Sequence, residues 1–102
     1  MNMLKMMKQA KEMQSKMKDV QKGLSKTEVE GSAGGGAVRV TATGDFQIRK
    51  VEIHPDVVDS DRVRKLEDLV LSACRQAMDR AKQVSESEIK KVTGGMSLPG
   101  LF

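Results

Sequence analysis

Residues 3–24 read MLKMMKQAKEMQSKMKDVQKGL, and the rest of the chain is organised around this stretch. Its apolar residues recur at alternating steps of four and three, which is typical of a helix that buries one narrow seam. The seam consists of Met6, Ala10, Met13, Met17, Val20 and Leu24. Lysines occupy the other sides. The pattern predicts a helix over 3–24, about 33 Å long at 1.5 Å per residue, which needs an apolar cover for its methionines and an acidic partner for its lysines.

The composition limits the size of the core. A chain of 102 residues predicts a single domain over 1–102, and a domain of this size buries only about two-thirds of its unfolded surface. Hydrophobic residues make up 38% of the chain, with two Phe and neither Trp nor Tyr. Such a thin core favours oligomerisation, because a partner buries further apolar surface.

The net charge of +4 is unevenly distributed. Residues 1–26 carry seven lysines against two acidic side chains, and residues 61–102 carry eight basic against six acidic ones. Residues 27–60 are acidic, with three basic and six acidic side chains. This asymmetry is expected if the helical ends of the chain bind a polyanion and the middle does not.

The side chains needed for catalysis or metal binding are lacking. One cysteine, Cys74, and one histidine, His54, allow neither an internal disulfide nor a four-ligand zinc site, so no metal and no cofactor is expected. The glycines of 31–36 precede a strand and no Gly-Lys-Ser/Thr follows them, which favours a hairpin loop over a phosphate loop. Cys74 falls on the apolar face of a helix, where a structural role is typical. We therefore expect neither an enzyme nor a small-molecule substrate.

Three short strands follow the first helix. They are expected at 27–31, 37–43 and 46–53, with glycine-rich turns between them. The third strand changes phase, because Ile48 lies on one parity and Val51 on the other. This slip indicates either a β-bulge near Arg49 and Lys50 or a central strand covered on both faces, and we favour the bulge.

A second long helix is expected over 60–92. Its N-cap is offered by Asp59, Ser60 and Asp61. Gly94 and Gly95 end it, because glycine readily adopts the left-handed conformation of a C-cap, and 94–102 form a tail. The apolar face of this helix consists of Val63, Leu66, Val70, Ala73, Ala77, Ala81 and Val84. Its alanines leave room for the first helix to approach closely, with Met13 and Met17 filling the remaining space.

The order of the elements is helix, three strands, helix. This is an α+β chain with a three-stranded antiparallel meander between a long N-terminal and a long C-terminal helix. Three strands leave two open edges and one apolar face, and a second copy would cover both. A homodimer is therefore the expected assembly.

The lysines of the first helix are the candidate binding site. They are Lys5, Lys8, Lys11, Lys16, Lys18 and Lys22. The sequence has no helix-turn-helix, zinc or basic-zipper pattern for reading bases, and it lacks the platform of several aromatic residues on which single strands stack. What remains is binding to the phosphate backbone of double-stranded DNA, with the lysines acting as point charges.

Three alternatives to DNA binding stay open. A run of charges is also typical of a solvated helix face. The methionine-lined helix could instead clamp a helix of another protein, which would make the chain an interaction adaptor. A basic amphipathic helix also suits anionic lipid. However, no apolar run reaches the ~20 residues of a membrane span or forms a signal peptide, which predicts a cytoplasmic protein without a membrane partner.

The chain resembles the YbaB/EbfC nucleoid-associated proteins of bacteria over nearly its whole length. The resemblance rests on the joint order and spacing of residues 4–10, 13–14, 16–17, 38–41, 51–55, 66–70 and 94–100. It implies a tweezer-shaped homodimer whose paired sheets form the hub and whose long helices project as arms. It also implies DNA binding with little or modest sequence preference, a location at the nucleoid, and a role in nucleoid organisation or gene regulation.

Carried over residue by residue, the resemblance implies two groups of DNA contacts. The first group is Lys5, Lys8 and Lys11, which belong to the lysine face described above. The second group lies in the C-terminal part of the last helix and consists of Lys82, Lys90 and Lys91. Glu86 and Glu88 dilute the charge of this second group.

Overall fold

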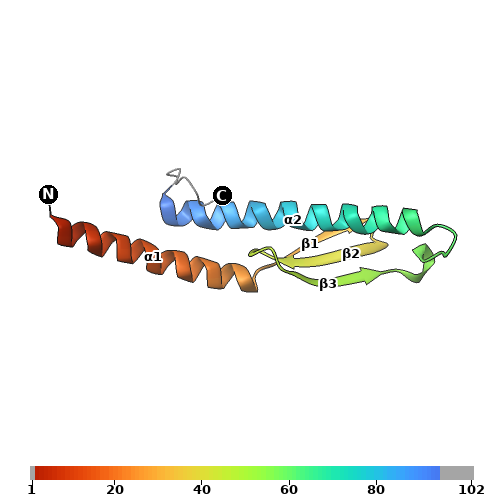
Figure 1. Ribbon diagram of the computed structural model, residues 1–102, viewed down its shortest axis with the longest axis horizontal. Coiled ribbons are helices and arrows are strands. Elements are labelled where there is room, and N and C mark those ends of the chain that lie inside the picture. Colours follow the sequence, from red (N-terminus) through yellow and green to blue (C-terminus); the bar gives the residue numbers. More distant parts are fainter. Residues whose placement is uncertain (1, 95–102) are drawn as a thin grey trace.

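The computed structural model describes residues 2–94 of the chain, which forms an elongated molecule about 70 Å long. The elements are α1 (Met3–Lys26), β1 (Glu28–Ala33), β2 (Val38–Thr43), β3 (Ile48–Ile53), a 3-10 turn η1 (Pro55–Val57) and α2 (Val63–Thr93). In Figure 1, α2 runs back over the sheet toward α1, and α1 projects away from the sheet. The predicted α+β order of helix, antiparallel meander and helix is confirmed. The expected tail lies outside the described residues, apart from Gly94.

Helix α1 is capped at both ends by nearby side chains. The side-chain oxygen of Asn2 accepts hydrogen bonds from the backbone N–H groups of Leu4 at 3.1 Å and Lys5 at 3.4 Å. At the other end, the Thr27 hydroxyl donates to the carbonyl of Gly23 at 2.8 Å. The helix therefore ends at Lys26, two residues beyond the predicted boundary.

The sheet has the strand order β1-β2-β3, and both pairs are antiparallel. On β3, Lys50 pairs with Thr41 and Ile48 pairs with Ala42, so Arg49 has no partner on β2. This extra residue is the β-bulge predicted from the phase slip. Strand β3 is an edge strand, which excludes the alternative of a central strand.

The hairpin turn between β2 and β3 holds the end of α1. The N–H of Gly44 donates to the carbonyl of Leu24 at 3.0 Å and to that of Thr27 at 2.9 Å. A Cβ added to Gly44 would lie 2.7 Å from Cδ2 of Leu24 and 3.2 Å from its carbonyl oxygen, so a larger residue would require Leu24 to move. Phe46 sits in the same turn with a φ of 67°, and the prediction that β3 begins at Phe46 is wrong because this left-handed conformation belongs to the turn.

Helix α2 begins later than predicted. It starts at Val63 with Arg62 as its N-cap, and no side chain caps it. The predicted caps are wrong because Asp59 is used elsewhere: its carboxylate accepts from the N–H of Asp61 at 2.9 Å, within the preceding turn. At the other end, Gly94 has a φ of 64° and its N–H bonds to the carbonyl of Lys90, as predicted for a glycine C-cap.

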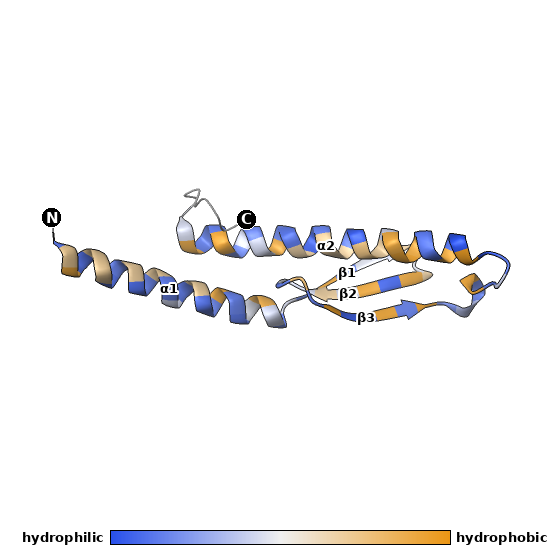
Figure 2. Cartoon of the chain, viewed as in Figure 1, coloured by the Kyte–Doolittle hydropathy of each residue, from blue (hydrophilic) through white to orange (hydrophobic). Residues whose placement is uncertain are grey.

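The core lies between α2 and the face of β1 and β2 that α2 covers. Val38, Val40 and Ala42 of β2 are fully buried against Ala73 and Ala77 of α2. Figure 2 shows apolar segments on β2, β3 and α2, alternating with hydrophilic ones. The alanines were expected to face the first helix; this is wrong for Ala73 and Ala77, because both lie against the sheet.

The buried residues of α2 recur at every fourth position. They are Ala73, Ala77, Ala81, Ser85, Ile89 and Thr93. Four residues make slightly more than one helical turn, so this row winds about 40° around the helix at each step. The first half of α2 therefore faces the sheet, and the second half faces α1. The predicted apolar face is correct in its middle, but Val63 at its start is 54% exposed.

Candidate nucleic-acid interface

The apolar seam of α1 is covered along only half of its length. Leu24 is buried and Met17 and Val20 are half-buried where α1 passes the end of α2. Toward the N-terminus, α1 extends past the end of α2 (Figure 1), and Met3 and Met6 are 75% and 52% exposed. We call this part of α1, residues 3–12, the arm.

Five lysines form a stripe on the side of α1 opposite the seam. They are Lys8, Lys11, Lys18, Lys22 and Lys26, and all five are exposed. Each is two positions from a seam residue, as Lys22 is from Leu24, and two positions correspond to about 200° around the helix. This lysine stripe is about 27 Å long at 1.5 Å per residue.

The remaining lysines of α1 flank the stripe. Lys5 and Lys16 are separated by eleven residues, or about three turns, so they lie on the same side of the helix as each other. Lys26 was not among the predicted site residues, because the helix was expected to end at 24. The signal that identifies it is its four-residue spacing from Lys22, which continues the stripe once the helix is known to reach Lys26.

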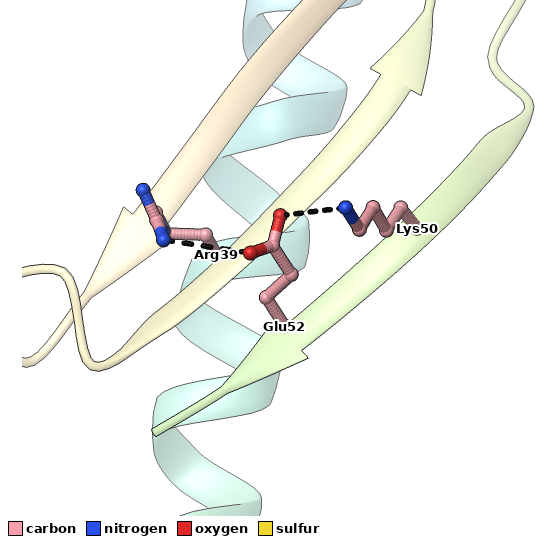
Figure 3. Close-up of polar contacts among 3 residues, drawn as sticks. All are labelled: Arg39, Lys50 and Glu52. Atoms are coloured by element: carbon pink, nitrogen blue, oxygen red, sulfur yellow. Dashed lines mark hydrogen bonds and ion pairs between the residues drawn. The ribbon is translucent and has the colours of Figure 1, made fainter.

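The lysines of the stripe form no ion pairs within the described residues. Among residues 2–94, no lysine of α1 takes part in an ion pair. The pairs that do form lie on the sheet, in the loop before α2 and on α2. Figure 3 shows one example on the sheet, where the Glu52 carboxylate lies 3.4 Å from Arg39 and 3.3 Å from Lys50. Within the described residues, the lysines of α1 therefore have no ion-pair partners. On the sheet face that carries Arg39, a carboxylate partly balances the positive charges.

The three candidate lysines of α2 do not share one face. Lys82 and Lys91 are nine residues apart, which is half a turn out of phase, and Lys90 is about 100° from Lys91. Two of them are paired with acids: Lys82 lies 4.0 Å from Glu86, and Lys91 lies 2.9 Å from Glu88. The structure thus brings the predicted α1 lysines together and leaves those of α2 dispersed.

The other candidate residues have structural roles. His54 accepts a hydrogen bond from the N–H of Asp56 through Nδ1 at 3.1 Å, so its side chain caps η1 at the end of β3. Glycines 34–36 form the turn between β1 and β2. Within residues 2–94, no group of three or more His, Cys, Asp or Glu side chains could hold a metal ion. No helix in this part of the chain is long and apolar enough to cross a membrane.

A second surface is an apolar groove between β3 and the first half of α2. It is lined by Ile53, Val63, Leu66, Glu67, Val70, Leu71 and Cys74. The groove exists because α2 is centred over β1 and β2, which leaves the apolar side chains of β3 uncovered: Val51 is 45% exposed and Ile53 is 40% exposed. We call this surface the β3–α2 groove.

The fold and the charge pattern together define a small α+β protein with a basic helical arm and an uncovered apolar groove. Residues 1–96 match the model of the YbaB/EbfC DNA-binding family, and the chain belongs to this family. The predicted family is thereby confirmed. It is a DNA-binding family rather than a family of enzymes, in agreement with the lack of a catalytic set in the sequence.

Individual relatives agree with this assignment. The chain is 49% identical over 102 residues to a nucleoid-associated protein of Clostridium novyi, covering 100% of this chain and 90% of the relative. It is 48% identical over 101 residues to a nucleoid-associated protein of Thermoanaerobacter pseudethanolicus, covering 99% and 91% of the two chains. The fold is similar to the crystal structure of an uncharacterized protein from Helicobacter pylori, with a TM-score of 0.74 at 17% identity, covering 92% of this chain and 96% of that one.

Proposed function

We propose that this protein binds double-stranded DNA through backbone phosphates, using the lysine stripe of α1 with Lys5 and Lys16 on its flank. The observation that supports this proposal is the unpaired charge: α1 carries seven lysines, and none forms an ion pair within residues 2–94. Glu12 and Asp19 stand three or four positions from several of these lysines, a spacing that allows ion pairs on a helix. Neither acid forms one within residues 2–94, and two acids against seven lysines leave α1 strongly positive. A helix face whose lysines form no ion pairs is well suited to binding a polyanion such as DNA.

The dimensions and chemistry of the stripe favour a duplex backbone over bases. Its length of about 27 Å approaches the 34 Å of one turn of duplex DNA. Lysine ammonium groups act as mobile point charges that contact phosphates without reading sequence. We therefore propose binding with little sequence preference and a role in nucleoid organisation or gene regulation in the bacterial cytoplasm.

We further propose that the protein acts as a homodimer joined at the β3–α2 groove. The outer edge of β1 is already occupied by α2: the N–H of Ser32 donates to Oε1 of Gln76 at 2.7 Å, and Arg80 donates to the carbonyl of Glu30. Strand β3 is the other edge and borders the groove. A second copy placed there would cover both the edge and the apolar side chains.

The apolar surface at the groove is substantial for so small a protein. Ile48, Val51, Val63 and Leu71 are 50%, 45%, 54% and 48% exposed. These half-exposed aliphatic side chains on β3 and α2 would contribute to an interface, and a stable one buries ~800 Å² on each partner. The self-complementary interface of a two-fold dimer needs only one such patch, because both copies contribute the same surface. The dimer would present two arms to DNA.

The lysines of α2 are proposed as weaker contacts. Lys90 takes part in no ion pair within the described residues, whereas Lys82 and Lys91 must give up Glu86 and Glu88 to meet a phosphate. Exposed pairs of this kind contribute only about 0.2–1 kcal/mol, so the cost of breaking them is small. The contribution of α2 to DNA binding should be smaller than that of α1.

The salt dependence of DNA binding tests the proposal. Each lost phosphate contact lowers the slope of log affinity against log salt by about one unit. The variant carrying Lys18→Gln and Lys22→Gln should bind two unrelated duplexes equally weakly, with a slope reduced by about two. The control carries Lys65→Gln and Arg75→Gln, which remove the same charge from exposed residues of α2 that form no ion pair within residues 2–94. Equal losses in both variants, or no binding by the unaltered protein at low salt, would contradict the proposal.

One observation supports a second candidate function. Met3, Leu4, Met6 and Met7 of the arm are between 52% and 78% exposed, and exposed methionines suit an adaptable protein-binding surface. An adaptor of this kind would bind a partner helix through the methionines and would keep that affinity when Lys18 and Lys22 are neutralised. The same double variant therefore separates the two functions.

A further inference from the structure

An open hollow of about 340 Å³ lies where α1 meets the sheet. It is lined by Ser25, Lys26, Glu28, Thr43 and Arg49. It begins at Lys26, the last residue of the lysine stripe, and it ends at Arg49 on β3. We propose that the path of the DNA backbone continues from the lysine stripe across this junction hollow, and that Arg49 holds a phosphate there. The inference rests on the proposed DNA-binding function and adds a site on the sheet.

The β-bulge is what makes Arg49 available. Because Lys50 pairs with Thr41 and Ile48 pairs with Ala42, Arg49 is the extra residue of β3. A bulge breaks the strict alternation of side chains and re-aims the residue that it inserts. Arg49 therefore reaches the junction hollow beside Lys26, which belongs to a different element.

The charge of Arg49 is open, in contrast to that of its neighbours. Lys50 and Arg39 share the carboxylate of Glu52, at 3.3 Å and 3.4 Å. Neither Arg49 nor Lys26 takes part in an ion pair within the described part of the chain. Lys26 of α1 and Arg49 of β3 therefore line the same hollow at the end of the lysine stripe, and neither forms an ion pair within the described residues.

The chemistry of arginine suits this position. Its planar guanidinium presents parallel N–H donors that match two oxygens of one phosphate, whereas a lysine offers a single point charge. Arg49 lies beside Lys26 at the far end of the stripe, which begins at Lys8. A contact at that end would fix the orientation of the duplex on the protein. The stripe supplies most of the affinity, and Arg49 would determine where the backbone crosses from arm to sheet.

Glu28 allows a second test, in which the substitution should strengthen DNA binding rather than weaken it. Its carboxylate lines the same hollow and forms no ion pair within residues 2–94. A negative charge beside a bound phosphate opposes binding, so neutralising Glu28 should strengthen DNA binding if the backbone passes here. If the DNA lies elsewhere, Glu28 has no such effect.

The experiment measures the affinity of the full chain for one duplex at several salt concentrations. Arg49→Gln should weaken binding about fivefold to tenfold at 0.1 M salt and lower the log–log slope by about one, as expected for one lost phosphate contact. Arg49→Lys should keep the slope, because the charge remains, and lose part of the affinity with the bidentate geometry. Glu28→Gln should tighten binding severalfold. The matched controls are Lys65→Gln for the lost cation and Asp79→Asn for the lost acid, both exposed on α2.

The outcomes distinguish this inference from the proposed function. If Arg49→Gln and Glu28→Gln bind like the unaltered protein while Lys18→Gln with Lys22→Gln loses affinity, the DNA backbone does not cross the junction hollow and only the inference is overturned. If the unaltered protein does not bind DNA at low salt, both are overturned. Arg49 and Glu28 are exposed, so thermal unfolding of each variant should match that of the unaltered protein.

Discussion

Gly31 of β1 lies in backbone contact with Ala77 of α2: a Cβ added to Gly31 would be 3.0 Å from the Cα of Ala77 and closer still to its backbone nitrogen. The two elements can approach this far only because one residue has no side chain and the other has a methyl group. This contact seats α2 over β1. It thereby leaves β3 uncovered, and the β3–α2 groove is the consequence.

The close contact predicts the effect of enlarging Gly31. Gly31→Ala should lower the free energy of unfolding by about 1–3 kcal/mol, because the added Cβ meets backbone atoms that cannot move aside easily. Gly23→Ala is the matched control: nothing lies within 4 Å of a Cβ at Gly23, and alanine in a helix should raise stability by about 0.5–1 kcal/mol. Urea denaturation measures both. Equal stability of the two variants would mean that helix and sheet are not in backbone contact.

The docking of α1 predicts a difference between its two ends. Leu24→Ala should cost about 2–4 kcal/mol, because Leu24 is 1% exposed and packs against the Gly44 turn. Leu4→Ala, at a position that is 78% exposed, should leave the free energy of unfolding nearly unchanged. Denaturant unfolding followed by circular dichroism measures both. A large loss from Leu4→Ala would show that the arm is covered in solution.

The proposed dimer predicts that a charge in the β3–α2 groove separates the subunits. Leu71→Glu should convert the dimer to a folded monomer, because Leu71 is 48% exposed in the single chain and would be buried by a second copy. Ser72→Glu places the same charge on the adjacent exposed residue, outside the groove, and should leave the dimer intact. Sedimentation measures the mass of each variant.

Cys74 provides an independent readout of the same interface. It lines the groove and is half-buried in the single chain, so its reaction with a maleimide should slow as protein concentration rises and a second copy covers it. The rate should no longer depend on concentration in Leu71→Glu. A rate independent of concentration in the unaltered protein, together with a monomer mass, would contradict dimerisation at this groove.

The dispersed lysines of α2 predict a smaller effect on DNA binding. The variant carrying Lys82→Gln, Lys90→Gln and Lys91→Gln should lower the salt slope by about one or less, although three charges are removed. The reason is that Lys82 and Lys91 are partly neutralised by Glu86 and Glu88 before DNA arrives. A fluorescence anisotropy titration at several salt concentrations measures the slope. A reduction of about three units would instead make α2 an equal partner of the lysine stripe.

The elements that could be predicted are those set by neighbours in the sequence. The α1 helix, the β2 alternation and the Gly94 C-cap each depend on residues a few positions apart, and the structure confirms them. The apolar seam of α1 is covered only in its C-terminal half. The bulge was predictable for the same reason, since the phase slip lies within one strand. Where several local partners competed, the prediction was less reliable: Asp59 could cap either the turn or α2, and it caps the turn.

The candidate site also has one part that follows from local sequence and one part that depends on long-range contacts. The lysine stripe follows from helical periodicity, and Lys26 was missed only because the end of α1 depends on contacts with the Gly44 turn. The sequence indicates a bulge near Arg49, but it does not indicate which residues lie beside that side chain. Its place beside Lys26 exists because the β2–β3 hairpin folds against the end of α1, which no local pattern specifies.

The amino-acid sequence was sufficient to determine which segments form helices and strands, the order of these elements and the excess of positive charge on the first helix. All three depend on local periodicity and composition. The folded chain was needed to show which surfaces stay open. The position of α2 over β1 rather than β3 depends on long-range contacts: the close backbone approach of Gly31 to Ala73 and Ala77, and the hydrogen bonds of β1 with Gln76 and Arg80. That long-range packing leaves the β3–α2 groove uncovered, and it orients the lysine stripe and Arg49 away from the core.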